Sequence, residues 1–145
     1  MQTVSSVMTA VPVTLPHREK LIAAARAMRD SSVGAVMVVR DGGQLHGVVT
    51  DRDIVIRGLA DGWDLAELSV GDVASPDPVA VRPDDSVDMA IGLMRDHAVR
   101  RLPVVEDGRP VGLVSIGDLA VGQDYEDDED NDSVLVGICA APPNS

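Results

Sequence analysis

The chain has 145 residues, 45% of them apolar, which is enough for one compact domain or two small domains that share a core. Its formal net charge is −12, and seven of its 24 acids lie between Asp124 and Asp132. A net negative charge disfavours binding to a phosphate backbone, and a chain with no Phe, one Trp and one Tyr has few rings on which bases stack. We therefore expect no nucleic-acid partner.

Cys139 is the only cysteine, which excludes an internal disulfide. No apolar stretch approaches the ~20 residues that span a bilayer. The beginning of the chain has no charged start followed by a long apolar run, so it does not read as a secretory signal. We expect a cytoplasmic protein with no membrane contact.

An internal repeat organises the chain. Residues 7–39 align with residues 73–105, so that Met28-Arg29-Asp30 matches Met94-Arg95-Asp96. One extra residue in the first glycine turn shifts the alignment, after which the motif GVVTDRD matches GLVSIGD. Matches over this length indicate two copies of one supersecondary unit.

Each copy begins with a short extended segment, which we predict at Val11–Thr14 and at Val79–Val81, next to prolines that suit strand edges and helix starts. An amphipathic helix follows, predicted over His17–Ser31 and Asp85–His97. In both stretches apolar residues recur at i, i+3, i+4 and i+7.

Two valine-rich strands joined by an Asp-Gly turn come next in each copy. They are continuously apolar, so both faces of the sheet should be covered. A second helix is predicted to begin at Asp51 and at Ile116. After the first of these helices, we expect a short helical turn that packs Trp63 at the seam between the copies.

The prediction is thus an α/β (α+β) fold of two pseudo-symmetric β-α-β-β-α units packed sheet to sheet. We expect unit 1 over residues 5–62, a linker over 63–72 and unit 2 over 73–122. Residues 123–145 are predicted to form an acidic, partly disordered tail. Within it, residues 133–141 are apolar and could add a strand or a docked segment to this chain or to a partner.

The repeated motif places a hydroxyl, Thr50 or Ser115, where a strand meets a helix, and a carboxylate, Asp53 or Asp118, three residues later. This is the pattern of a capping box, which stabilises a helix without any ligand. The same atoms suit a ligand site, because helix N-termini attract anions and an Asp can accept hydrogen bonds from a ribose. At this point both interpretations stay open.

The two copies, their GVVTDRD and GLVSIGD motifs and the run HAVRRLPVVEDGRPVGLVS resemble a tandem CBS-domain pair, the Bateman module, over about residues 5–122. The stretch TDRDIVIRGLADG is similar to small stand-alone bacterial members, including the actinobacterial hypoxic-response type. The resemblance implies a non-catalytic regulatory module that binds AMP, ADP, ATP or S-adenosylmethionine in the clefts between the units. It also implies a homodimer formed through the helices.

The resemblance also implies a role for each site residue. The carboxylates would bind ribose, the backbone near each first strand would lie along adenine, and a basic residue would face phosphate. The first copy has Gly34-Ala35 where the second has two arginines, so unequal sites are expected and the second is favoured. The implied ligand-binding residues are Thr50, Asp53 and Val13 in the first copy and Ser115, Asp118, Val79, Arg100 and Arg101 in the second.

The alternative is a structural or interaction protein without a nucleotide ligand, in which both motifs only cap helices. Such a protein would act through its dimer surface or its acidic tail on a protein partner. An enzyme is not expected, because no Ser/His/Asp arrangement or P-loop is present. The histidines and Cys139 lack zinc-ligand spacing, so no metal and no certain cofactor are predicted.

Overall fold

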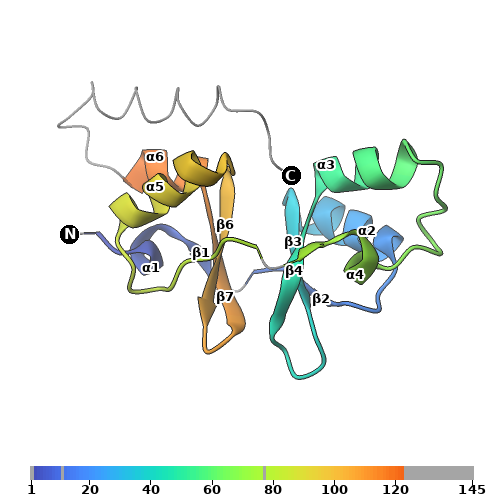
Figure 1. Ribbon diagram of the computed structural model, residues 1–145, viewed down its shortest axis with the longest axis horizontal. Helices are drawn as coiled ribbons and strands as arrows, with labels where there is room; N and C mark the ends of the chain where they lie inside the picture. Colours follow the sequence, from blue (N-terminus) through green and yellow to red (C-terminus); the bar gives the residue numbers. More distant parts are fainter. Residues whose placement is uncertain (1, 11, 77, 123–145) are drawn as a thin grey trace. The chain divides into compact units, whose positions relative to one another are not determined.

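The computed structural model describes residues 2–10, 12–76 and 78–122, and the tail predicted at 123–145 lies outside the described residues. The described chain forms two compact units, each with its own sheet and helices (Figure 1). The mixed α+β fold expected from the sequence is therefore confirmed. The first unit contains most of the first repeat, and the second unit contains most of the second repeat.

The sheet of the first unit has four strands in the order β2, β3, β4, β5. β2 (Thr14–Pro16) runs parallel to β3 (Ala35–Val39), which forms an antiparallel hairpin with β4 (Leu45–Thr50). β5 (Ser75–Pro76) completes the sheet, antiparallel to β4. β3 is buried along most of its length, as its run of aliphatic residues predicts.

The helices of the first unit pack their apolar faces on this sheet. α2 (Leu21–Ser31) buries Leu21, Ala24 and Met28, which share one face of the helix. α3 (Asp51–Asp53) continues directly into the π-helical segment η1 (Ile54–Leu59), and α4 (Val70–Val73) precedes β5.

The second unit repeats this arrangement with the order β1, β7, β6. β1 (Thr9–Ala10) pairs antiparallel with β7 (Arg109–Ser115), which lies beside β6 (Arg101–Glu106). In Figure 1 the helices of this unit lie to one side of its sheet. They are α1 (Val4–Val7), α5 (Val87–His97) and α6 (Ile116–Gly122).

The short elements at the beginning of each repeat belong to the unit of the other repeat. α1 and β1 precede the first repeat's helix yet join the core and sheet of the second unit, where Val4 is fully buried. α4 and β5 begin the second repeat yet join the first unit, where Val70 is fully buried. The boundaries predicted at 5–62 and 73–122 stay predictions for the sequence repeat, whereas the compact units exchange these segments.

Trp63 does not pack as predicted. Its side chain is 56% exposed, and its backbone N–H donates to the carbonyl of Gly58 at 3.1 Å. The apolar side chains of this connection that pack on the core are Leu65 and Leu68. Two nearby leucines thus supply the burial that the sequence suggested for the tryptophan.

Candidate functional site

Both hydroxyl–carboxylate turns form complete capping boxes. In the first unit the backbone N–H of Asp53 donates to Thr50 Oγ1 at 3.2 Å, and the N–H of Thr50 donates to Asp53 Oδ2 at 2.9 Å. In the second unit the N–H of Asp118 donates to Ser115 Oγ at 3.2 Å, and the N–H of Ser115 donates to Asp118 Oδ2 at 2.9 Å. Each box satisfies backbone donors that the first turn of a helix otherwise leaves unpaired.

The two carboxylates differ in burial. Asp53 is 1% exposed, and its Oδ1 atom is buried without a hydrogen-bond partner among the described residues. Asp118 is half-buried, so its second oxygen is not enclosed in the same way. The two capping boxes thus share their hydrogen bonds and differ in how far the carboxylate residue is enclosed.

One backbone carbonyl of the second unit lacks a hydrogen bond that its counterpart in the first unit accepts. In the first unit the N–H of Met37 donates to the carbonyl of Val13 at 2.9 Å. The repeat places Pro103 opposite Met37 and Val79 opposite Val13. Because proline has no N–H, the carbonyl of Val79 receives no backbone hydrogen bond from a described residue.

Two prolines explain why the segment near the predicted strand at Val79–Val81 keeps a single parallel bridge, between Val81 and Val104. Pro103 cannot donate to Val79, and Pro83, which aligns with His17, cannot donate to Val105 as His17 N–H does to the carbonyl of Val39 at 2.9 Å. The neighbouring bonds of this segment persist. Val81 N–H donates to the carbonyl of Pro103 at 3.0 Å, and Val105 N–H donates to the carbonyl of Val81 at 2.8 Å. Val79 therefore lies beside β6, where half-buried Arg101 begins the strand.

The arginines distinguish the two units as the sequence predicts. Ala35, which aligns with Arg101, is 4% exposed and carries no charge. The N–H of Ile116 donates to the carbonyl of Arg100 at 2.9 Å, so the beginning of β6 lies next to the beginning of α6. The second unit thus brings the Val79 carbonyl, Arg101 and the Ser115–Asp118 capping box to one end of its sheet.

Sequence reasoning missed Pro103. Its aligned counterpart is Met37, whose N–H donates to the carbonyl of Val13. The difference between proline and methionine at this position could have predicted that the carbonyl of Val79 lacks the equivalent donor. Comparing the repeats for residues that lack a backbone N–H, as well as for side chains, therefore finds the carbonyl of Val79.

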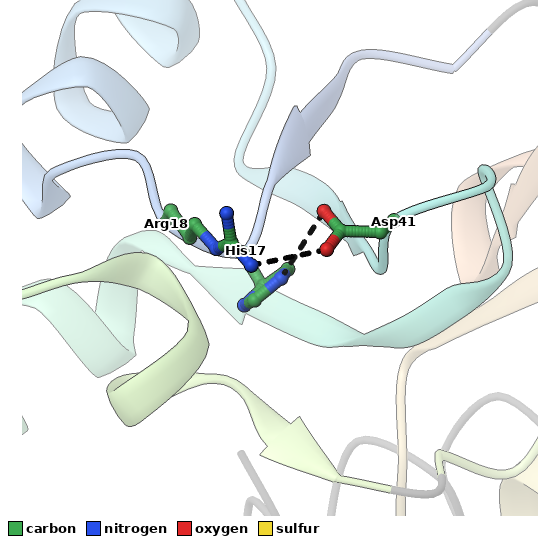
Figure 2. A network of polar contacts seen from close by, with 3 residues as sticks. All are labelled: His17, Arg18 and Asp41. Carbon is green, nitrogen blue, oxygen red and sulfur yellow. Dashed lines mark hydrogen bonds and ion pairs between the residues drawn. The ribbon is translucent and has the colours of Figure 1, made fainter.

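A polar cluster lies apart from these residues in the first unit. Figure 2 shows His17 and Arg18 pointing toward Asp41 in the turn between β3 and β4. Arg18 Nη2 lies 3.1 Å from Asp41 Oδ2, and His17 Nε2 lies 3.7 Å from Asp41 Oδ1. Arg18 and Asp41 are each 76% exposed, so this pair contributes little stability.

In another exposed ion pair, on α2, an arginine changes the pKa of its partner carboxyl. Arg29 Nε donates to Asp30 Oδ1 at 2.8 Å, and this hydrogen bond lowers the pKa of the Asp30 carboxyl below its usual value.

Among residues 2–10, 12–76 and 78–122, no group of three or more His, Cys, Asp or Glu side chains is arranged to hold a metal ion. In the same ranges, no helix has the length and apolar character that a membrane crossing requires.

Comparison with known proteins identifies relatives over most of the chain. Residues 4–59 and 70–122 match the family model of the CBS domain. Hypoxic response protein 1 of Mycobacterium tuberculosis is 38% identical over 120 residues, which cover 83% of this chain and 84% of that protein.

Solved structures agree with this match. The crystal structure of Hypoxic Response Protein I with two coordinated zinc ions has a TM-score of 0.78 at 36% identity, covering 85% of this chain and all of that one. The structure of CBSX2 in complex with AMP has a TM-score of 0.71 at 26% identity, covering 83% of this chain and 95% of that one.

Proposed function

Because the chain belongs to the CBS-domain family, we propose that it is a non-catalytic regulatory module that binds an adenosine-containing ligand through its second unit. The observation that carries this proposal is the carbonyl of Val79, which accepts no backbone hydrogen bond from a described residue and lies at the same end of the sheet as Arg101 and half-buried Asp118. The ligand class is AMP, ADP, ATP or S-adenosylmethionine.

Each group in the second unit has a chemical role in this proposal. The carbonyl of Val79 accepts a hydrogen bond from the N6 amino group of adenine, where guanine instead carries a carbonyl oxygen. Asp118 keeps its capping bond through Oδ2 and accepts ribose hydroxyls at its other oxygen. The guanidinium of Arg101, with Arg100 beside it in sequence, neutralises phosphate. CBSX2, a relative crystallised with AMP, supports the adenosine class.

The first unit takes a lesser part. Thr50 and Asp53 form a capping box whose carboxylate is enclosed, and Ala35 replaces the arginine. The carbonyl of Val13 is already paired with Met37. These three differences favour one adenosine ligand per chain.

An interaction protein without a nucleotide is the second candidate. Both capping boxes are complete without any ligand, and large apolar side chains are exposed on helices of both units. We infer a cytoplasmic homodimer in either case. Its contacts would come from exposed helix residues such as Met89 on α5 and Leu59 on η1, which are 49% and 58% exposed.

The proposal is tested by thermal unfolding with millimolar AMP, ADP, ATP or S-adenosylmethionine. A ligand at 100 times its dissociation constant should raise the unfolding free energy by about 2.7 kcal/mol. Asp118→Ala should abolish this gain and also lower the stability of the free protein by about 1 kcal/mol, because the cap is lost.

The matched control is Asp53→Ala, which removes the equivalent cap in the first unit. It should lower stability and leave the ligand-induced gain in place. If none of the four ligands stabilises the wild-type protein, nucleotide binding is refuted and the interaction protein is favoured. Equal loss of the gain in both variants would refute the assignment to the second unit.

A further inference from the structure

The short strand β1 has little apolar packing of its own. It lies at the edge of the second unit's sheet and pairs with β7 at two described positions, Thr9 with Leu113 and Ala10 with Gly112. Thr9 and Ala10 are both exposed. Met8, just before β1, is half-buried and packs against the core of this unit. The side chain of Met8 therefore supplies apolar packing directly beside the strand.

The thioether of Met8 covers the glycine that begins the second repeated motif. Met8 Sδ lies 2.5 Å from the position that a Cβ atom of Gly112 would take, so the sulfur fills the space that this glycine leaves free. The first repeat has Ala74 at the position of Met8, and its Gly47 is approached by Ala74 Cβ and by the backbone of Ser75. The sulfur atom thus has no counterpart at the aligned position of the first repeat.

Met8 combines packing with access in a way that the other described methionines do not. Met28, Met37 and Met94 are 8%, 1% and 0% exposed, and this burial protects their sulfur atoms from reagents in water. Met89 on α5 is 49% exposed, so a polar group added to it can be hydrated in place. Because Met8 is half-buried, a reagent can reach a residue whose apolar character the packing needs.

We propose that Met8 is a site of reversible oxidation by hydrogen peroxide, and that its sulfoxide loosens β1 from β7. In this reaction a lone pair of Sδ attacks one peroxide oxygen, and an S–O bond forms as the O–O bond breaks. The departing hydroxide takes the proton of the transferred hydroxyl group and leaves as water. The sulfur loses two electrons, which the peroxide gains. A methionine sulfoxide reductase reverses the change with electrons from a thiol.

The sulfoxide does not fit the packing that the thioether makes. Oxidation converts an apolar side chain with a weakly accepting sulfur into a polar one with an accepting oxygen. The polar backbone atom beside this contact is the carbonyl oxygen of Thr9, 3.0 Å from the same Cβ position of Gly112, and it is also an acceptor. The N–H of Met8 already donates to the carbonyl of Val4 at 2.9 Å. Hydration of the sulfoxide therefore favours withdrawal of Met8 from Gly112, which removes packing from β1.

The test treats the full-length protein with hydrogen peroxide and follows each methionine by peptide mass spectrometry. Every sample carries Cys139→Ser, because peroxide also oxidises a thiol. We expect Met8 to be oxidised faster than the three buried methionines. After oxidation, amides in residues 2–10 and in β7 should exchange with deuterium about tenfold faster. Treatment with methionine sulfoxide reductase should restore the original exchange rates.

Three variants show whether Met8 is responsible. Met8→Leu keeps an apolar side chain of similar volume without sulfur, so peroxide should leave exchange in residues 2–10 unchanged. Met89→Leu is the matched control, because it removes the exposed methionine of α5, and the faster exchange should persist. Met8→Gln introduces a polar side chain without any oxidant and should exchange as fast as the oxidised protein.

Three results would overturn the proposal. One is oxidation of Met8 that is no faster than that of the buried methionines. Another is complete oxidation of Met8 with unchanged exchange in residues 2–10, and the third is a peroxide effect that survives in Met8→Leu. If Met8→Leu does not fold, the reductase experiment decides, since exchange that stays fast after Met8 has been reduced excludes the sulfoxide as its cause.

A consequence for ligand binding rests on the function proposed above. β1 pairs with Gly112 and Leu113, and β7 ends at Ser115 of the capping box. Oxidation should therefore lower the thermal stabilisation that an adenosine ligand gives to this protein, but not to peroxide-treated Met8→Leu. If no such ligand stabilises the unoxidised protein, the proposed function fails while the exchange result stands. Equal stabilisation before and after oxidation would refute the coupling.

Discussion

Gly47 and Gly112 begin the two repeated motifs because a neighbouring strand passes directly against each of them. A Cβ atom at Gly47 would collide with the backbone carbonyl oxygen of Ser75 in β5. A Cβ at Gly112 would lie 2.5 Å from Met8 Sδ and 3.0 Å from the carbonyl oxygen of Thr9 in β1. These glycines therefore serve the packing of the exchanged strands, whereas the ligand chemistry lies further along the motif.

Replacing Gly47 by alanine should destabilise the protein, because the obstructing atom is backbone and cannot rotate away. We expect a loss of about 1–3 kcal/mol in the unfolding free energy, measured by urea denaturation. Gly92→Ala is the control, since a Cβ there meets nothing within 4 Å and the position lies inside α5. That variant should gain up to about 1 kcal/mol. A Gly47→Ala protein as stable as wild type would contradict the close approach.

The segments that precede α2 and α5 show how prolines change an element. β2 forms three parallel pairs with β3, whereas its counterpart in the second unit keeps only the bridge between Val81 and Val104. Pro103 cannot donate to Val79, and Pro83, which aligns with His17, cannot donate to Val105. The second unit therefore lacks part of this strand at the place where we propose that adenine binds.

Pro103→Met copies the residue found in the first repeat and restores the missing donor. The new N–H should bond to the carbonyl of Val79, raise stability by about 1 kcal/mol and protect that amide from exchange. Because the carbonyl is then occupied, adenosine-ligand affinity should fall about fivefold, as measured by calorimetry. Unchanged affinity would show that the ligand does not use this carbonyl.

Each unit is completed by the first helix and strand of the other repeat. α1 and β1 complete the second unit, and α4 and β5 complete the first. The same backbone bonds support both exchanges: Val4 N–H donates to the carbonyl of Asp85, and Val70 N–H donates to that of Glu19. Neither repeat can therefore bury its core with its own residues alone.

Val4→Ala and Val70→Ala form a matched pair that tests this exchange. Each valine is fully buried, so each variant should lose about 2 kcal/mol of stability. Val4→Ala should accelerate hydrogen exchange in α5 and β6, far away in the sequence. Val70→Ala should do so in α2 and β3. Acceleration confined to each valine's own sequence repeat would contradict the exchange.

The sequence alone determined the repeat, the helices α2 and α5, both hairpins, the hydroxyl–carboxylate pattern of the two capping boxes and the resemblance to the family. These features depend on local patterns, namely apolar periodicity, Asp-Gly turns and a hydroxyl three residues before a carboxylate. The unequal basic residues, Arg101 against Ala35, were equally visible in it. The assignment of an adenosine ligand to these residues remains a proposal.

Only the tertiary structure decided which unit each terminal segment joins, because strands of two residues carry too little pattern to show their partner. It also decided that Asp53 is buried and Asp118 half-buried, since identical capping boxes can be covered to different degrees. The exposure of Val55, Ile56 and Leu59 on η1 likewise depends on what packs nearby. Local chemistry is thus determined by neighbours in sequence, whereas access to it is determined by neighbours in space.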